Sequence, residues 1–342
     1  MFTLRNFSYV VRPQPVTVKA SDALDLYSLK YLEILLGRSR SELRDLASHA
    51  TRYYKPFPLR PKSRPFTKRA EVPKRRWIDH PIDPLKAIQS RIQERILSPL
   101  ILPEHLLGGV RGKSITDNAR LHLQAPWLVT VDIKNFFPSI SPKLVRQVFR
   151  GLLNCSPEVS HLLTGLTTCR DRLPQGAPTS PLLANLVLSG FDGEIRSACR
   201  KNAIRYSSWI DDLAFSGISA REIIGPVISV LMGAGFKVSH RKIEIMGPRD
   251  RKILNKLVLG KFVTVQKQYR KRMRAGIHNL SCEKVRDHEV AAYVESLRGG
   301  ISYIGLFDPK RAVLLQQQLK DACAQREAHR LCRDDKFRDK TV

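Results

Sequence analysis

Three aspartates occupy positions where a carboxylate is costly unless it binds a cation. Asp132 closes the apolar run Leu-Val-Thr-Val-Asp, and Asp211 and Asp212 are adjacent within Trp-Ile-Asp-Asp-Leu-Ala-Phe. Each of two neighbouring carboxylates opposes the ionisation of the other, and burial raises that cost. A divalent cation removes it, and oxygen ligands in ones and twos suit Mg²⁺. Two such ions would activate a 3′-hydroxyl and stabilise a leaving pyrophosphate, whereas the plainer alternative is an Asp-Asp pair that only caps a turn.

Two further motifs lie between these aspartates. Phe136 and Phe137 follow Asp132, and the loop Leu-Pro-Gln-Gly-Ala-Pro-Thr-Ser-Pro spans 173–181. The order of these motifs resembles the palm of reverse transcriptases, and the resemblance extends over roughly residues 50–320. It implies an α+β right-hand polymerase with fingers, a palm made of an antiparallel sheet with helices, and a helical thumb.

The resemblance assigns a role to each acidic residue. Asp132, Asp211 and Asp212 match the three catalytic carboxylates of the family. The implied cofactors are two Mg²⁺ ions, for which Mn²⁺ can substitute, and the implied substrates are dNTPs. The metal ligands that it implies are Asp132, Ile133, Asp211 and Asp212.

Other residues match the incoming-nucleotide pocket of the same family. Phe137 stands where the family has a steric gate against the 2′-hydroxyl, although an ordinary core phenylalanine is the alternative. Gln175 and Gly176 match positions that line the pocket, in a loop that flanking prolines fix. In Lys-Arg-Arg-Trp-Ile-Asp-His-Pro, Arg75 with Asp79 resembles the fingers strand that holds the triphosphate. The sequence does not separate Arg75 from its neighbours Arg76 and Lys74 in this role.

Within the family, the retron type is most similar. Arg-Arg-Trp-Ile-Asp-His-Pro resembles the retron segment before the following helix, and Asn118 to His122 fits the retron N-A-x-x-H insertion. The alternative for the insertion is a helix cap with a solvated histidine. Segments 265–280 and 297–309 look like the retron thumb. Two departures stand out: Trp209 replaces the tyrosine of Y-x-D-D, and Leu254-Asn255-Lys256 replaces the V-T-G triplet.

The resemblance implies an RNA-directed DNA polymerase that copies a structured noncoding RNA into single-stranded DNA by two-metal nucleotidyl transfer. It also implies an antiphage role with an accessory effector or toxin protein. Two alternatives remain: a defence-associated reverse transcriptase with another mode of priming, and a catalytically idle RNA-binding subunit. The expected partners are that RNA and its DNA copy. The residues expected to contact the RNA are Asn118, His122, Asn255, Lys256, Lys267, Arg270, Lys271, Arg272 and Arg274.

The RNA-contacting residues are expected on two helical faces. Asn118 and His122 are four apart, on one face if their segment is helical. In the segment 265–280, Tyr269, Met273 and Ile277 are spaced to form the buried stripe of a helix. Its basic side chains would then project outward, where they neutralise phosphates.

The elements that must position these residues follow from periodicity. A strand is expected at 128–133 and a strand–turn–strand unit at 205–217, with further strands near 236–246 and 256–265. Apolar residues at helical spacing predict a helix through Leu85, Ile88, Ile92 and Ile96. The other expected helices cover 22–50, 142–165, 181–202, 219–234 and much of 265–330. The expected domains are an N-terminal helical region (1–50), fingers and palm (51–255), the thumb (256–325) and a charged tail (326–342).

Composition narrows the partner class. The chain has 342 residues, of which 42% are hydrophobic, so it can bury a sizeable core. Its formal net charge of +28 favours a polyanionic partner. Residues 52–76 alone carry ten Lys or Arg and five prolines, which predicts a basic loop or strand pair. No apolar run long enough for a membrane span or signal peptide is present, so we expect a cytoplasmic protein without a membrane partner.

Overall fold

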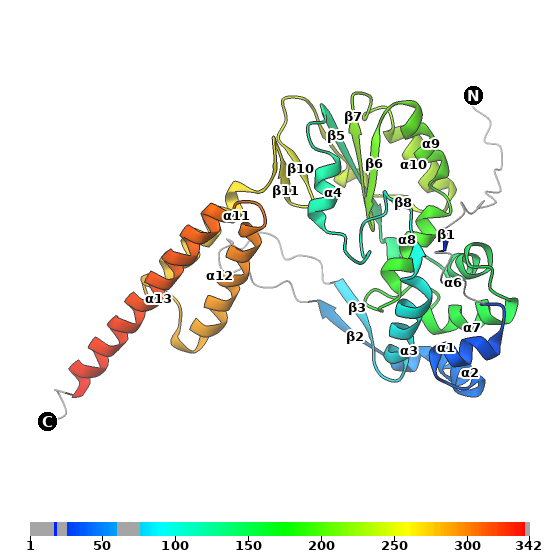
Figure 1. Cartoon of the computed structure of the whole chain (residues 1–342), viewed down its shortest axis with the longest axis horizontal. Coiled ribbons are helices and arrows are strands. Elements are labelled where there is room, and N and C mark those ends of the chain that lie inside the picture. Colours follow the sequence, from blue (N-terminus) through cyan, green and yellow to red (C-terminus); the bar gives the residue numbers. More distant parts are fainter. Residues whose placement is uncertain (1–16, 19–25, 60–75, 339–342) are drawn as a thin grey trace. The chain divides into compact units, whose positions relative to one another are not determined.

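The computed structural model describes residues 17–18, 26–59 and 76–338. The described chain forms two compact units, one ending at Lys252 and one beginning at Ile253. The first unit contains a five-stranded antiparallel sheet with helices, and the second is mainly helical (Figure 1). The fold class is therefore α+β. Within the described residues, no helix combines the length and the apolarity needed to cross a membrane.

The sheet of the first unit is built on β5 (Trp127–Lys134), whose residues alternate between its two faces. β6 (Arg205–Trp209) and β7 (Asp212–Gly217) form a hairpin, and the strand order is β6-β7-β5-β8. β8 (Lys237–Val238) and β9 (Glu244–Met246) both pair with β5. These strands confirm the expected strand at 128–133 and the hairpin at 205–217.

Helices cover both faces of this sheet. α4 (Ile115–Leu121) packs on β6 on one side, and α9 (Gly193–Lys201) and α10 (Ile224–Gly233) lie on the other (Figure 1). Every residue of α8 (Ser180–Ser189) except Pro181 is buried. The expected helix 181–202 is thus two helices, and the expected helix 219–234 begins only at Ile224.

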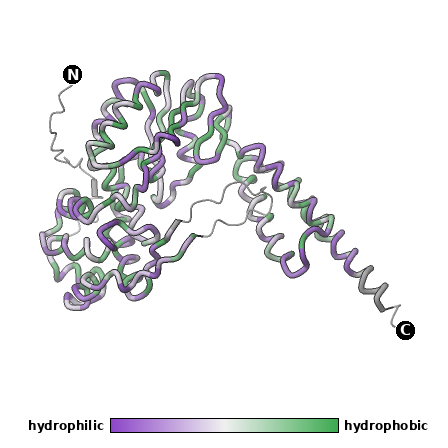
Figure 2. Tube along the Cα trace, turned by 180° about the vertical axis from the view of Figure 1, so that it is seen from behind, coloured by the Kyte–Doolittle hydropathy of each residue, from purple (hydrophilic) through white to green (hydrophobic). Residues whose placement is uncertain are grey.

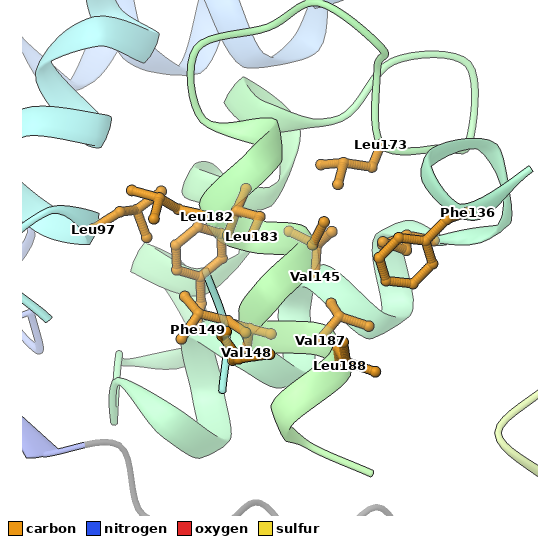
Figure 3. Packing of buried hydrophobic residues seen from close by; sticks show 14 of the residues in the cluster. Leu97, Phe136, Val145, Val148, Phe149, Leu173, Leu182, Leu183, Val187 and Leu188 are labelled. Atoms are coloured by element: carbon orange, nitrogen blue, oxygen red, sulfur yellow. The ribbon is translucent and has the colours of Figure 1, made fainter. Parts of the chain in front are cut away.

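A second group of helices packs together in the same unit. It contains α1 (Leu29–Leu36), α2 (Arg40–Ser48), α3 (Leu85–Ile92) with the π-helical segment Gln93–Leu97, and α7 (Pro157–Thr167). The predicted stripe Leu85, Ile88, Ile92 and Ile96 is fully buried, as expected. α6 (Pro142–Gln147) continues into the π-helical segment Val148–Leu152, whose Phe149 lies near Leu183 of α8 (Figure 3).

The expected continuous helix at 142–165 is wrong in one place. Asn154 has a positive φ of 50°, which ends the first helix, and Ser156 caps the next one by accepting a hydrogen bond from Val159 N at 3.2 Å. Between α2 and α3, β2 (Tyr54–Leu59) pairs antiparallel with β3 (Arg76–Pro81). The described ends of the basic segment are therefore the expected strand pair. Its middle, residues 60–75, lies outside the described residues.

Three short strands, the first of which starts at the boundary residue Lys252, are followed in the second unit by three helices. β10 (Lys252–Leu254), β11 (Leu257–Leu259) and β12 (Val263–Val265) form a small sheet. α11 (Lys267–Ser281), α12 (Val290–Gly305) and α13 (Pro309–Arg338) pack against one another. The polar and apolar residues of this unit alternate along its helices (Figure 2).

Helix α13 does not stop where a charged tail was expected. It continues from Pro309 to Arg338, across the boundary at residue 326. Arg326 itself is buried and donates to Val285 O at 2.7 Å and to Asp287 at 2.5 Å. The start of the expected tail is therefore part of the packed helices.

Candidate active site

Strand pairing brings the three aspartates to one end of the sheet. Asp132 on β5 is the direct cross-strand partner of Asp212 on β7. The amide of Ile133 donates to the carbonyl of Asp211 at 2.9 Å, which fixes the turn against β5. Side chains of directly opposite residues lie on the same face of an antiparallel pair, so Asp132 and Asp212 are neighbours there.

The turn that carries Asp211 is held in an unusual conformation. Ile210 has a φ of +63°, a left-handed conformation that β-branched residues rarely adopt. The Ser208 hydroxyl donates to Ile210 O at 3.0 Å. A loop packs behind it: a Cβ on Gly108 would lie 2.5 Å from Ile210 N, and Asn185 donates to Gly108 O at 2.8 Å. Only a glycine allows the loop to approach this closely, so the surrounding chain determines the strained turn.

Lys242 lies beside these carboxylates, although no sequence pattern singles it out. Its ammonium group donates to Asp132 Oδ2 at 2.7 Å, while the Lys242 side chain stays half exposed. The short helical turn His240–Lys242 places it there, because Ser239 N donates to Asp132 O at 2.9 Å. In the sequence, Lys242 was only one of many basic residues after position 240. Its distance of 110 positions from Asp132 left no local signal.

The donor atoms at this end of the sheet fit a hard divalent cation. Asp132 and Asp212 present carboxylate oxygens from adjacent strands, and such ligands suit Mg²⁺. Among the described residues, no three His, Cys, Asp or Glu side chains are grouped closely enough to hold a metal ion as they stand. Ile133 has a buried aliphatic side chain, so its carbonyl oxygen is the only atom with which it can act as a ligand.

The residues expected around the nucleotide lie on a loop against β3. Asp79 N on β3 donates to Gln175 O at 2.9 Å, and a Cβ on Gly176 would lie 2.6 Å from Ile78 Cγ2. Gly176 also has a φ of +124°, so both the lack of space and the backbone conformation exclude a side chain there. Arg76 is the first residue of β3, whereas Arg75 lies outside the described residues.

Two arginines outside the expected site residues neutralise the charge of Asp79 on β3. Buried Asp79 forms ion pairs with Arg172 at 3.2 Å and with Arg170 at 3.5 Å. Within the described residues, the charge of Asp79 is matched by these two arginines. Arg170 and Arg172 directly precede the motif 173–181, and this proximity in the sequence is the signal that could have identified them.

Phe136 and Phe137 differ in burial. Phe136 is 2% exposed and packs on Phe236 with ring centroids 5.4 Å apart. Phe137 is only partly buried, on the helical turn Phe136–Ser139 that follows β5. The partly exposed ring is the one available for contact with a substrate.

The expectation that Asn118 and His122 contact RNA is wrong in this structure. Both side chains are 0% exposed, although they lie on one helical segment as expected. His122 Nε2 and Nδ1 lie 2.7 Å from the hydroxyls of Ser207 and Ser216, on β6 and β7. Burial, together with the charge of Arg205, lowers the pKa of His122 to about 3, so the ring is neutral. The solvated histidine considered as the alternative is equally excluded.

The basic residues of the second unit are mostly accessible. Lys267, Lys271 and Arg274 on α11 are exposed, and Arg270 and Arg272 are partly buried. Of the expected buried stripe, Ile277 is buried, whereas Tyr269 and Met273 are only partly so. A cavity of about 530 Å³ gathers cations from α11 and the start of α13, lined by Arg270, Arg274, Asp308, Lys310, Arg311, Leu314, Leu315 and Gln318.

Asn255 and Lys256 form the two-residue connection between β10 and β11. Their φ angles are +47° and +66°. The type I′ turn of two-residue hairpins needs positive φ at both central residues, and Asn followed by Gly is a preferred pair there. The V-T-G triplet would place its glycine at position 256, where this chain has an exposed lysine.

Sequence comparison decides the family. The profile of the reverse transcriptase (RNA-dependent DNA polymerase) family matches residues 67–280. The chain is 31% identical to the retron Ec86 reverse transcriptase of Escherichia coli over 239 residues, covering 69% of this chain and 72% of that protein. The chain belongs to the retron reverse transcriptases. It is therefore an RNA-directed DNA polymerase, of a family that in general uses dNTPs and a divalent metal.

Other retron enzymes are similar over different parts of this reverse transcriptase. The retron Ec83 enzyme of Escherichia coli is 35% identical, over 53% of this chain and 62% of that protein. The retron Mx65 enzyme of Myxococcus xanthus is 28% identical, over 83% of this chain and 69% of that protein. Among solved structures, a truncated apo telomerase from Candida tropicalis (13% identity, 66% and 59% coverage) and a foamy viral protease–reverse transcriptase with double-stranded DNA (15% identity, 85% and 42% coverage) both have TM-scores of 0.42.

Proposed function

We propose that this retron reverse transcriptase copies one structured noncoding RNA into single-stranded DNA, the msDNA-type product. The observation that carries the proposal is the pairing of Asp132 with Asp212 beside Asp211, in a chain that matches retron enzymes over much of its length. In this proposal the first unit supplies the fingers and palm and the second supplies the thumb. The retron family also suggests an antiphage role with an accessory effector protein.

Asp132, Asp211, Asp212 and the Ile133 carbonyl would hold the divalent ions. Two Mg²⁺ ions, or Mn²⁺ in their place, supply charge neutralisation for nucleotidyl transfer when bound. Lys242 keeps a positive charge beside Asp132, which stabilises a carboxylate that is otherwise almost buried. Phe137 excludes the ribose 2′-hydroxyl, and Gln175, Gly176 and β3, with Arg76 or Arg75, border the dNTP.

The second unit would hold the RNA through its phosphates. Arg270 and Arg274 share their cavity with Lys310 and Arg311, against a single carboxylate from Asp308. Lys267, Lys271 and Arg272 on α11, and Asn255 and Lys256 at the β10–β11 turn, extend the basic surface. Charge contacts alone bind any RNA and weaken with salt, so selection of one RNA needs additional contacts of shape.

One purification separates this function from its alternatives. The protein and its Asp211→Asn variant are expressed in the native host, purified at elevated salt, and the bound nucleic acid is sequenced. We expect one structured RNA joined to its DNA copy on the natural enzyme. The variant should carry the same RNA without DNA, because loss of one ligand disrupts the metal site but leaves the basic surface intact.

The other outcomes each contradict the proposal. DNA on the variant would show that Asp211 is not required for synthesis. A random sample of cellular RNA on both proteins would remove the specific template. RNA without any DNA on the natural enzyme would indicate the idle RNA-binding subunit, and DNA unlinked to a structured RNA would indicate another mode of priming.

A further inference from the structure

Four polar side chains are completely buried between α4 and the hairpin that carries Asp211 and Asp212. Asn118 and His122 come from the α4 segment, and Ser207 and Ser216 come from β6 and β7. All four are 0% exposed. Burying polar groups is costly unless each is hydrogen-bonded, so their grouping in the middle of the sheet requires an explanation. We call these four residues the α4 network.

In the α4 network, each donor group can be assigned from the hydrogen bond that follows it. The Ser207 hydroxyl donates to Asn118 Oδ1 at 2.5 Å, so Ser207 Oγ must accept from His122 Nε2 at 2.7 Å. This assignment places the imidazole proton on Nε2 and leaves Nδ1 to accept from the Ser216 hydroxyl at 2.7 Å. The chain therefore runs from Ser216 through the neutral His122 and Ser207 to Asn118. Bonds linked in this way polarise and strengthen one another.

Strand register places the α4 network next to the catalytic carboxylates. Cross-strand partners form rows on one face of the sheet, and successive rows are roughly 7 Å apart. The first row is Leu128, Ser216 and Arg205, the second is Thr130, Ala214 and Ser207, and the third is Asp132, Asp212 and Trp209. The network holds the first two rows of the hairpin. The third row, which carries the carboxylates, follows directly.

We propose that Asn118 and His122 are positioning residues, which clamp β6 and β7 together so that Asp211 and Asp212 are held in register with Asp132. This inference rests on the proposed catalytic role of those aspartates. A shift of β7 by one residue would turn Ser216 to the opposite face and break the network. Apolar side chains could fill the same space, but they would not oppose such a shift through directional bonds. Asn118 and His122, which the sequence alone assigned to RNA contact, thus act instead on the end of the sheet that carries the three aspartates.

Substitutions of His122 can remove one arm of the network at a time. His122→Asn keeps an amide near the Nδ1 position, toward Ser216, and His122→Gln keeps one near Nε2, toward Ser207. Ser216→Ala removes a single hydroxyl and is the mildest variant. The matched control is Asp117→Ala, because Asp117 caps the same helix through Ser114 and takes no part in the network.

The test combines hydrogen exchange with Mn²⁺ binding and primer extension. In the network variants, we expect amide exchange in 205–217 to accelerate about tenfold or more, and Mn²⁺ affinity and kcat to fall by about 10- to 100-fold. KM for dNTP should change little, because Phe137 and the 173–176 loop are untouched. Asp117→Ala should lower Tm while leaving metal affinity and kcat near those of the natural enzyme.

The outcomes distinguish this inference from the function it rests on. If folded network variants keep natural exchange in 205–217 and natural Mn²⁺ affinity, the positioning role is wrong. If Asp117→Ala lowers the metal affinity as much as the network variants do, the network only stabilises helix α4 and has no specific positioning role. If the natural enzyme itself makes no DNA, the proposed function fails, but the exchange measurement still tests the clamp. Should the His122 variants not fold, Ser216→Ala carries the same comparison.

Discussion

Acid should destabilise this protein through His122, which is 0% exposed and hydrogen-bonded on both nitrogens. Burial, aided by the charge of Arg205, lowers the pKa of His122 from 6.5 to about 3. Between pH 3 and pH 6.5, the His122 side chain is protonated in the unfolded chain but neutral in the folded protein. The free energy of unfolding must therefore decrease as the pH falls from about 6.5 toward 3, and the contribution is complete above pH 6.5.

The size of this effect follows from the two pKa values. Each pH unit across the window costs up to about 1.4 kcal/mol, so the whole shift corresponds to about 5 kcal/mol. Since small domains are stable by roughly 5–15 kcal/mol, a loss of this size approaches their total stability. At pH 4 the loss is about 3 kcal/mol, so the protein should be clearly less stable there than at pH 7.

The assay compares urea unfolding of the natural protein and His122→Gln at pH 7, 6, 5 and 4. Glutamine does not titrate, so the variant should be less stable at pH 7 and lose less stability on acidification. The two curves should converge as the pH falls, because other titrating groups affect both proteins alike. Parallel curves across this range would refute the buried neutral histidine.

The remaining predictions concern the gate and the β10–β11 turn. Phe137→Ala should admit ribonucleotides, measured as the ratio of dNTP to rNTP incorporation on one template, while Phe136→Ala should cost about 3–5 kcal/mol of stability without changing that ratio; an unchanged ratio for Phe137→Ala places the gate elsewhere. Lys256→Gly should stabilise the protein by about 1 kcal/mol, because its φ of +66° suits glycine. The same change should reduce the salt dependence of RNA binding by about one phosphate contact. Lys256→Gln should reduce the salt dependence of RNA binding equally, but it should not stabilise the protein. If Lys256→Gly is no more stable than the natural protein, the strain argument is wrong.

The sequence predicts the convergence of the three aspartates at one end of the sheet because its signals are local. Alternation of apolar residues defines β5, and the hairpin around Asp211 and Asp212 is short, so their convergence needs only one strand pairing. Two adjacent acidic residues in an apolar hairpin are informative by themselves. The comparison with retron enzymes supports the same family from independent positions along the chain.

The parts that were missed depend on contacts between distant positions. Asn118 and His122 look like surface residues until Ser207 and Ser216 are brought to them from 85 to 94 positions away. Lys242 reaches Asp132 across 110 positions. No periodicity encodes such pairs, because a polar residue with a buried partner and a polar residue in water look alike in a sequence.

The loop behind the turn that carries Asp211 also protects an edge of the sheet. β6 is an edge strand of the sheet, and edge strands expose backbone groups that can pair with other chains. Here Ser208 N donates to His105 O at 2.7 Å and Leu107 N donates to Ser208 O at 3.0 Å, so the loop occupies that edge next to Trp209. The opposite end of β6 begins with the charged, exposed Arg205. The segment that builds the turn therefore also prevents this edge from adding a foreign strand and starting aggregation.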